Sequence, residues 1–452
     1  MLNQVIDVDR LVDEQTLGWF NLSLLIWSFL AMFADGYDIA VLSFAVKDLR
    51  LLWHTTQTAL GAASTMSLIG ILVGSPLMGY VGDRFGRKRA ILLGTAIYGV
   101  ASLGIVWANG LTALIVLRFV TGIGLGGLMP NTIALNSELA PARLRATLVV
   151  LMFVGITVGS SAPGLTAAWL VPHYSWRVLF LLGGLVPLLV GVGLIFALPE
   201  SVKFLAMCRD RPRELLALAR RMRPDLALSD DTRFTLAQSG TSSAVGLKEL
   251  YSPALARITP FLWVCFAMAL MSNFFLNSWL PAVFAGSGLT DRQADIAATF
   301  YHVGGAVGGV CMAMLLDRFG FVITTVLFAA AVPAIAAIGF TSMSYGVLSV
   351  LAGVGGLCVL GAQFGNNASA GLVYPTAIRS KGVGWALGIG RFGAILGPLI
   401  GGRLLDMHIQ TRQLFIAAAL PMLIGAIAAC VVLKRCYVRL HTLRLSEIGG
   451  TP

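Results

Sequence analysis

Long hydrophobic runs, each ended by a short polar or charged segment, make up most of the chain. A helix needs about 20 mainly apolar residues to cross the hydrocarbon core of a bilayer. Breaks at charged residues, proline and glycine divide the runs into twelve such segments, six on either side of one long polar stretch. The expected helices are 21–46, 58–81, 90–108, 112–135, 147–170 and 176–198, followed by 258–285, 293–316, 322–342, 345–371, 381–404 and 411–433.

The composition agrees with a membrane protein whose helices pack closely. Hydrophobic residues make up 57% of the 452 residues and charged residues only 12%, whereas soluble domains carry about 25% charged residues. The 51 glycines suit membrane helices, in which small residues let backbones approach one another. The sequence therefore predicts an all-α protein with twelve transmembrane helices.

The chain repeats itself at a shift of 234 residues. Gly-Asp-Arg-Phe-Gly at Gly82–Gly86 returns as Leu-Asp-Arg-Phe-Gly at Leu316–Gly320. A single shift that holds across several helices predicts two six-helix halves in parallel repeat. It also relates Gly70 to Gly304, Gly74 to Gly308, Pro141 to Pro375, Arg145 to Arg379 and Gly159 to Gly393. We expect an N-terminal half over 1–198, a linker with short amphipathic helices over 199–257, a C-terminal half over 258–434 and a tail over 435–452.

The net charge of +11 is unevenly distributed. Basic residues gather in alternate loops, in the polar stretch and in the tail, and the loop around Arg87 is the richest. The positive-inside rule places both termini and the linker in the cytoplasm. Topology and anionic lipid therefore account for the charge without nucleic acid as a partner. The acidic residues before the first apolar run, among them Asp7 and Asp9, exclude a cleaved signal peptide.

Cysteine and histidine show no metal-binding spacing. The six cysteines form no Cys-x-x-Cys pair, and the five histidines are dispersed. A membrane enzyme should show a metal cluster or a nucleophile with its base, and a sensor should show an output domain. We expect neither function, and no metal or cofactor.

Asp35 and Asp38 lie in the middle of the first apolar run. Their i, i+3 spacing places both carboxyls on one helical face, with Tyr37 beside them. A charged residue at that depth costs about 2.5–3.5 kcal/mol on insertion scales. Two such costs on one face indicate a polar pathway for protons or ions.

Arg118 lies inside the fourth expected helix, and buried arginines pair with another group. Asp35 and Asp38 are the only acids expected at its depth in the same half. We therefore expect a contact between Arg118 and one aspartate, which a proton on that aspartate would weaken. A static structural ion pair is the alternative.

Arg391 lies about eleven residues into the helix 381–404, where no acid of the second half is expected at the same depth. A guanidinium can bind a carboxylate through two parallel hydrogen bonds. The position predicts an anion-binding residue, with an ion pair to Asp38 as the alternative.

Amides and aromatic rings supply further candidates for binding a planar acid. They are Tyr37, Asn273, Asn277, Trp279, Gln363, Asn366 and Phe392, of which many of the rings are expected to pack or to face lipid instead. His302 is a candidate proton relay because its reference pKa is about 6.5. Its alternative is an ordinary hydrogen-bonding role.

A cytoplasmic gate is expected where charges of both signs meet at helix ends. The motif from Gly79 to Arg89 should let Gly79 pack closely, Asp83 meet a helix N-terminus or an arginine, and the basic run anchor at the inner leaflet. An ordinary basic loop, or simple solvation of the helix ends, is the alternative. The gate candidates are Asp83, Arg84, Arg87, Glu138, Arg145, Asp317, Arg318 and Arg379.

This motif resembles the signature of the major facilitator superfamily. Asp35-Gly36-Tyr37-Asp38, Arg118, Asn277–Pro281, Gly390-Arg391 and Gly393-x-x-x-Gly397-Pro398 together resemble the aromatic acid:proton symporter family. The resemblance implies import of a benzoate or hydroxybenzoate-class acid with protons across the cell inner membrane, for aromatic hydrocarbon catabolism. It also implies that Asp35, Asp38, Arg118 and Arg391 matter for transport. We expect a monomer. A symporter of a non-aromatic organic acid and a drug/proton antiporter are the alternatives.

Overall fold

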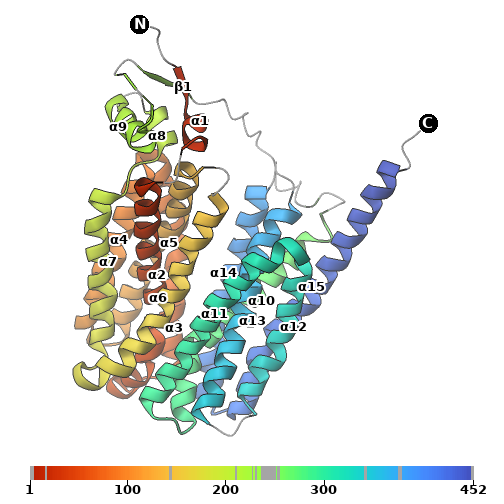
Figure 1. The fold of residues 1–452 in the computed structure, drawn as a ribbon. Coiled ribbons are helices and arrows are strands. Elements are labelled where there is room, and N and C mark those ends of the chain that lie inside the picture. The colour runs from red at the N-terminus through yellow and green to blue at the C-terminus, as the bar shows by residue number, and fades with distance from the viewer. Residues whose placement is uncertain are drawn as a thin grey trace. The chain divides into compact units, whose positions relative to one another are not determined.

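The computed structural model describes the chain in ten stretches, which together hold all the predicted helices (Figure 1). The described residues are 5–15, 18–141, 145–208, 211–226, 228–229, 232–235, 251, 255–340, 344–374 and 379–448.

Twelve long helices appear in this part of the chain, as predicted, and most begin and end within four residues of the expected positions. Eleven of them are long and apolar enough to cross a membrane; α11 is as long as its neighbours but is not among the eleven. The helices are α2 (Trp19–Trp53), α3 (Gln57–Phe85), α4 (Arg87–Gly104), α5 (Leu111–Leu139), α6 (Arg145–Tyr174), α7 (Arg177–Ala197), α10 (Thr259–Gly286), α11 (Asp291–Phe319), α12 (Phe321–Ile338), α13 (Tyr345–Val373), α14 (Arg379–Asp406) and α15 (Thr411–Ile448).

Two helices extend well beyond their predicted ends. α2 continues past Lys47 to Trp53, and α15 runs through the expected tail to Ile448. An apolar run marks where a helix crosses hydrocarbon. The helix itself continues for as long as its backbone hydrogen bonds do, so the end of the run is not the end of the helix.

The helices divide between two compact units. Unit 1 comprises Met1–Ile39, Ile69–Ser160 and Arg177–Ser242, and unit 2 comprises Ala40–Leu68, Ser161–Trp176 and Ser243–Pro452. The boundaries cut through α2, α3 and α6, so unit 2 includes one end of three helices that the sequence assigns to the first half. The two six-helix halves stay a prediction about domain organisation.

Glycines repeat their packing partners at the shift found in the sequence. In unit 1, a Cβ at Gly70 would lie 2.2 Å from the Phe119 carbonyl oxygen; in unit 2, one at Gly304 would lie 1.9 Å from that of Gly353. Partner and glycine are both displaced by 234 residues. The same holds for Gly74 with Ile123 and Gly308 with Leu357, and for Gly159 with Phe33 and Gly393 with Ala267. The repeat is therefore a repeat of helix contacts.

The contacts in each unit follow from this glycine packing. In unit 1, α4 packs against α5 and α7, with Gly94 against Gly124 at the α4–α5 crossing. In unit 2, α11 packs against α13, α10 against α14 and α12 against α15, and Figure 1 shows these helices in green to blue.

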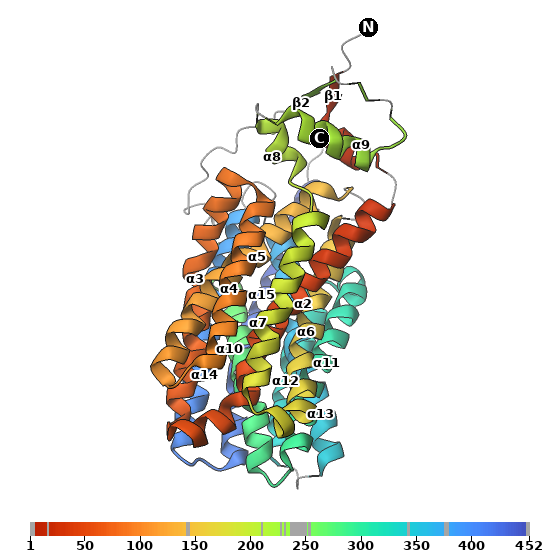
Figure 2. The same ribbon diagram turned by 90° about the vertical axis from the view of Figure 1, so that its left-hand side faces the viewer.

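The N-terminal segment folds together with the first part of the linker in unit 1 (Figure 2). Strand β1 (Val5–Asp7) pairs in parallel with β2 (Arg233–Thr235). Helix α1 (Val8–Asp13) packs against the linker helices α8 (Val202–Met207) and α9 (Pro212–Met222). The short helices of the linker, α8 and α9, were expected, whereas the strand pair was not. A small apolar core lies between α1 and the linker and consists of Leu11, Leu216, Ala219 and Leu228.

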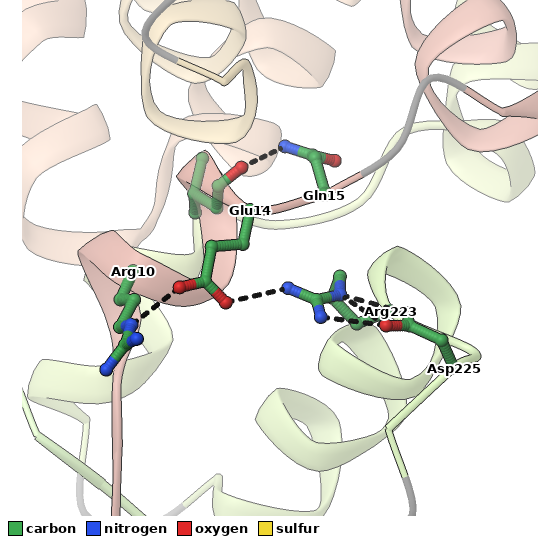
Figure 3. A network of polar contacts seen from close by, with 6 residues as sticks. Arg10, Glu14, Gln15, Arg223 and Asp225 are labelled. Atoms are coloured by element: carbon green, nitrogen blue, oxygen red, sulfur yellow. Dashed lines mark hydrogen bonds and ion pairs between the residues drawn. The ribbon is translucent and has the colours of Figure 1, made fainter.

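Polar contacts fasten α1 to α9 (Figure 3). Arg10 Nε donates to Glu14 at 2.6 Å, and Arg223 Nη1 donates to the other Glu14 oxygen at 3.3 Å. Arg223 also donates to Asp225 at 2.7 Å. The hydrogen bonds from Arg10 and then Arg223 lower the pKa of Glu14, and the bond from Arg223 lowers that of Asp225. Both carboxylates therefore stay ionised at neutral pH.

Gln15 joins this N-terminal segment to the bundle. Its side chain is fully buried, and Nε2 donates to the Val12 carbonyl at 2.9 Å and to the Leu139 carbonyl at 2.7 Å. Leu139 is the last residue of α5, so its carbonyl has no partner within the helix.

We predict that Gln15→Ala destabilises the protein by about 1–3 kcal/mol, because it leaves the buried Leu139 carbonyl without its side-chain donor. Thermal unfolding of the purified protein in detergent measures the effect, with Gln410→Ala, at an exposed glutamine, as the matched control. Equal melting temperatures for the two variants would contradict the assigned role of Gln15.

Candidate functional site

Unit 1 contains a buried ion pair between Arg118 and Asp38. Arg118 Nη1 donates to Asp38 Oδ2 at 2.9 Å, and both terminal nitrogens approach the Asp38 backbone carbonyl at 3.3 Å. Asp38 is fully buried and Arg118 is 2% exposed. The predicted contact between Arg118 and one aspartate is therefore confirmed.

A third helix completes the surroundings of Asp38. Ser102 Oγ of α4, also fully buried, donates to Asp38 Oδ1 at 3.1 Å. Both carboxylate oxygens of Asp38 thus accept a hydrogen bond, one from α4 and one from α5. Arg118 Nε is buried without a hydrogen-bond partner in the described part of the chain.

Asp35 lies one turn before Asp38 and is 4% exposed. No hydrogen bond to its carboxyl occurs among the described residues, and it interacts electrostatically with Asp38. Tyr98 of α4 is fully buried, its hydroxyl has no described hydrogen-bond partner, and it interacts electrostatically with both aspartates. The two acids therefore have different surroundings.

Sequence reasoning missed the contribution of α4. Thr95, Tyr98 and Ser102 are its buried polar residues, and their spacing of three and four places them on one face. That polar stripe in an apolar helix was the available signal.

Close backbone packing sets the position of the Asp35–Asp38 turn. A Cβ at Gly36 would lie 2.0 Å from the Ile156 carbonyl oxygen of α6, and Ser160 Oγ donates to the Gly36 carbonyl at 3.0 Å. Tyr37 is 7% exposed and its hydroxyl donates to the Leu179 carbonyl of α7 at 3.2 Å. The turn is thus held against two helices while its carboxyls meet α4 and α5.

A second polar group lies in unit 2, where three helices contribute. Tyr301 Oη of α11 donates to Asn273 Oδ1 of α10 at 3.0 Å, and Asn273 Nδ2 donates to Gln363 Oε1 of α13 at 3.2 Å. Tyr301 lies edge-on to His302, with the ring centroids 5.4 Å apart. The structure thus brings together Asn273, Gln363 and His302, which the sequence singled out separately.

A narrow pocket adjoins this group in unit 2. Asn277 and His302 supply its polar groups, and Phe44, Leu276, Leu280 and Tyr301 supply apolar surface. Both polar residues are 6% exposed.

The remaining binding candidates lie in different surroundings. Trp279 is 1% exposed, donates from Nε1 to the Pro398 carbonyl at 3.0 Å and contacts Gly61, so it packs α10 against α14. Asn366 is fully buried, and neither its amide oxygen nor its amide nitrogen has a hydrogen-bond partner in the described chain. Arg391 is half-buried on α14, and the Phe392 ring is 60% exposed.

Three residues expected to belong to a cytoplasmic gate, Asp83, Arg87 and Glu138, lie together in unit 1. Arg87 contacts Asp83 at 2.5 Å and Glu138 at 3.9 Å, and Glu138 accepts a hydrogen bond from Ser201. Glu200, which the sequence did not single out, accepts from the Lys88 backbone N–H at 3.1 Å. The linker therefore contacts both the motif loop and the end of α5.

Other gate candidates lie at the surface or outside the described side chains. Arg84 is exposed and donates to the Tyr80 hydroxyl at 2.5 Å, and exposed Arg318 lies over the Phe319 ring. The side chains of Arg145, Asp317 and Arg379 lie outside the described residues.

The expectation that Gly79 permits close packing is wrong. A Cβ there would meet nothing within 4 Å in the described structure. Two other motif glycines are in close contact: a Cβ at Gly82 would lie 1.9 Å from Asn131 Oδ1, and one at Gly86 would lie 2.2 Å from Glu200 Oε2. Spacing along the motif did not show which glycine faces α5.

Unit 2 contains a second set of contacts, between the ends of α2, α3 and α6 and the C-terminal helices. Asp406 of α14 accepts the Gln57 and Thr58 backbone N–H groups at 2.9 and 2.8 Å. Lys47 pairs with Asp291, and Arg292 lies 3.9 Å from the Trp169 ring centroid. These contacts join the ends of α2, α3 and α6 to α11 and α14.

We predict that Gly36→Ala strongly destabilises the protein, because the added methyl group would overlap the Ile156 carbonyl. Gly79→Ala is the matched control, since its methyl group meets open space. The yield of monodisperse protein and its melting temperature measure both variants. A Gly36→Ala variant as stable as Gly79→Ala would rule out the described α2–α6 packing.

Comparison with known proteins agrees with this architecture. The sequence model of the Major Facilitator Superfamily matches residues 28–287 and, separately, 262–445. A gallate transporter of Pseudomonas putida is 33% identical over 94% of each chain. The 4-hydroxybenzoate transporter PcaK of Pseudomonas aeruginosa is 34% identical, over 95% of this chain and 96% of that protein.

Among solved structures, the xylose transporter XylE from E. coli has the same fold. A partially occluded inward-open form aligns with a TM-score of 0.70 at 18% identity, over 92% of this chain and 99% of that one. The fold, the helix count and the family match agree with the expectation from the sequence. The chain therefore belongs to the major facilitator superfamily and is a multi-pass membrane transporter.

Proposed function

We propose that the protein imports an aromatic carboxylate of the benzoate or hydroxybenzoate class together with protons. The observation that carries this proposal is the buried Arg118–Asp38 pair with a second carboxylate, Asp35, one turn away. The substrate class is supported by two relatives that match nearly the whole chain, a gallate transporter and a 4-hydroxybenzoate transporter. The protein would work as a monomer in the cell inner membrane, with both termini in the cytoplasm.

Proton coupling would arise from the charge balance around Arg118. With both aspartates ionised, the three groups carry a net negative charge in an apolar interior, which is unfavourable. A proton on either aspartate neutralises the group. Protonation therefore shifts the population between conformations that differ in how well they tolerate this charge.

Substrate binding would use residues of unit 2. Arg391 would hold the carboxylate through two charge-assisted hydrogen bonds. Asn366 supports an amide contact to the substrate, because a buried amide without partners costs about 1–3 kcal/mol that a ring hydroxyl would recover. The Asn273–Gln363 bond and the adjacent His302 provide further polar groups near an apolar surface.

Alternating access would proceed by rocking of the predicted halves 1–198 and 258–434. The contacts of Asp406 with Gln57 and Thr58 would form the outer gate, and those of Arg87 with Asp83 and Glu138 would form part of the inner gate. A monoanion that moves with one proton is electroneutral. The membrane potential, worth about 2.3 kcal/mol per charge per 100 mV, then contributes only if a second proton moves.

We predict that Asp38→Asn abolishes accumulation of labelled 4-hydroxybenzoate by vesicles under an imposed pH gradient. Arg391→Ala should chiefly weaken binding, raising the half-saturating concentration by about tenfold to a hundredfold, because a hydrogen bond to a charged group is worth about 1.5–3 kcal/mol. Arg213→Ala, at an exposed arginine of α9, is the control. Accumulation like that of the wild type by both test variants would reject this scheme.

The substrate class can be tested by thermal shift on the purified protein. Benzoate, 4-hydroxybenzoate and gallate should raise the melting temperature, because a ligand at about 100 times its Kd stabilises the folded state by about 2.7 kcal/mol. Aliphatic carboxylates of equal charge are the control. Stabilisation by the aliphatic acids alone would overturn the aromatic assignment.

A further inference from the structure

We infer that Asp35 is the residue that carries the coupled proton, while Asp38 stays ionised as the permanent counter-ion of Arg118. The inference rests on the proposed proton coupling and goes beyond it, since coupling alone does not distinguish the two aspartates.

Asp38 has the surroundings of a fixed anion. Its oxygens accept from Arg118 at 2.9 Å and from Ser102 at 3.1 Å, and all three side chains are at most 2% exposed. A proton on Asp38 would take the counter-charge from a guanidinium that is buried with it. Removing one partner of a buried ion pair costs about 3–5 kcal/mol.

Asp35 has the surroundings of an exchangeable group. Its side chain is nearly as buried as that of Asp38, yet no hydrogen bond to it occurs among the described residues. It shares a helix face with Asp38, so two ionised carboxylates would lie one turn apart in an apolar interior. Arg118 already balances the negative charge of Asp38, so a proton on Asp35 leaves the three side chains with no net charge.

Among the residues that the structure describes, no positively charged side chain is paired with Asp35. α4 contributes Tyr98 and Ser102, both neutral, and α5 contributes Arg118. The titratable residues of α6 and α7 lie at their ends: Arg145, His173, Tyr174 and Arg177. The Tyr98 hydroxyl, which has no hydrogen-bond partner among the described residues, is neutral and interacts electrostatically with both aspartates.

The Arg118–Asp38 pair is then a constant feature of the cycle. Loading and release of the proton change the charge at Asp35 alone. Asp35→Asn, whose side chain cannot bind or release a proton, should therefore permit exchange of substrate across the membrane and prevent net accumulation. Neutralising Asp38 should impair both, because it leaves Arg118 without its counter-ion.

Infrared spectroscopy of the purified protein tests the assignment directly and needs no substrate. The wild type should show the carbonyl band of a protonated, buried carboxylic acid, which disappears as the pH rises. Asp35→Asn should remove this band and Asp38→Asn should keep it. Loss of the band in Asp38→Asn with retention in Asp35→Asn, or a wild type without such a band, would overturn the inference.

Two further variants protect this test against misfolding. Asp38→Asn/Arg118→Gln removes both charges of the pair and should fold where Asp38→Asn alone does not, with the band retained. Ser102→Ala weakens only the surroundings of Asp38 and should also keep the band. Loss of the carbonyl band in either variant would contradict the assignment of the proton to Asp35.

Transport of labelled 4-hydroxybenzoate in vesicles supplies the functional readout. Under a gradient of about one pH unit, each carried proton supports about tenfold accumulation. Asp35→Asn should lose this tenfold accumulation and retain exchange, and loss of both activities would overturn the inference. A wild type that fails to transport the acid would reject the proposed function, while the infrared result would still decide which aspartate is protonated.

Discussion

The structure of unit 1 depends on the need to neutralise a charge in an apolar interior. Arg118 is 2% exposed, and its partner Asp38 is fully buried. Neither would be stable there alone. Around this pair, α2, α4 and α5 are held together, Ser102 supplies the second hydrogen bond to Asp38, and Gly36 lets α2 approach α6 closely enough to orient the turn.

The two repeats keep their packing and differ in their chemistry. The glycine contacts of Gly70 and Gly304 recur at one shift, so the same helix crossings are built twice. At the positions of Asp35 and Asp38, however, the second half carries Ala269 and Ser272. Unit 2 instead contains the Tyr301–Asn273–Gln363 network and Arg391. Close packing requires small residues wherever backbones meet, whereas nothing in it requires the same polar groups.

The linker is also more than a connection between halves. Its Glu200 and Ser201 bind the motif loop and Glu138, and its α9 binds the N-terminal segment through Arg223 and Glu14. The end of α5 therefore contacts both the linker, through Glu138, and the N-terminal segment, through Leu139. The sequence indicated only a polar tether with short helices. It did not indicate the parallel strand pair, because composition carries no signal for pairing between residues 228 positions apart.

The sequence by itself determined the twelve helices, the repeat and the Arg118–aspartate contact. Each follows from a local rule or from the high energy of a lone charge in hydrocarbon. Tertiary structure alone decided which aspartate binds Arg118, that Ser102 completes the site, that Gly82 and not Gly79 meets α5, and that Trp279 packs against α14. Spacing along a helix shows which side chains share a face. It does not show which face of a neighbouring helix they meet, because that depends on how all the helices pack together.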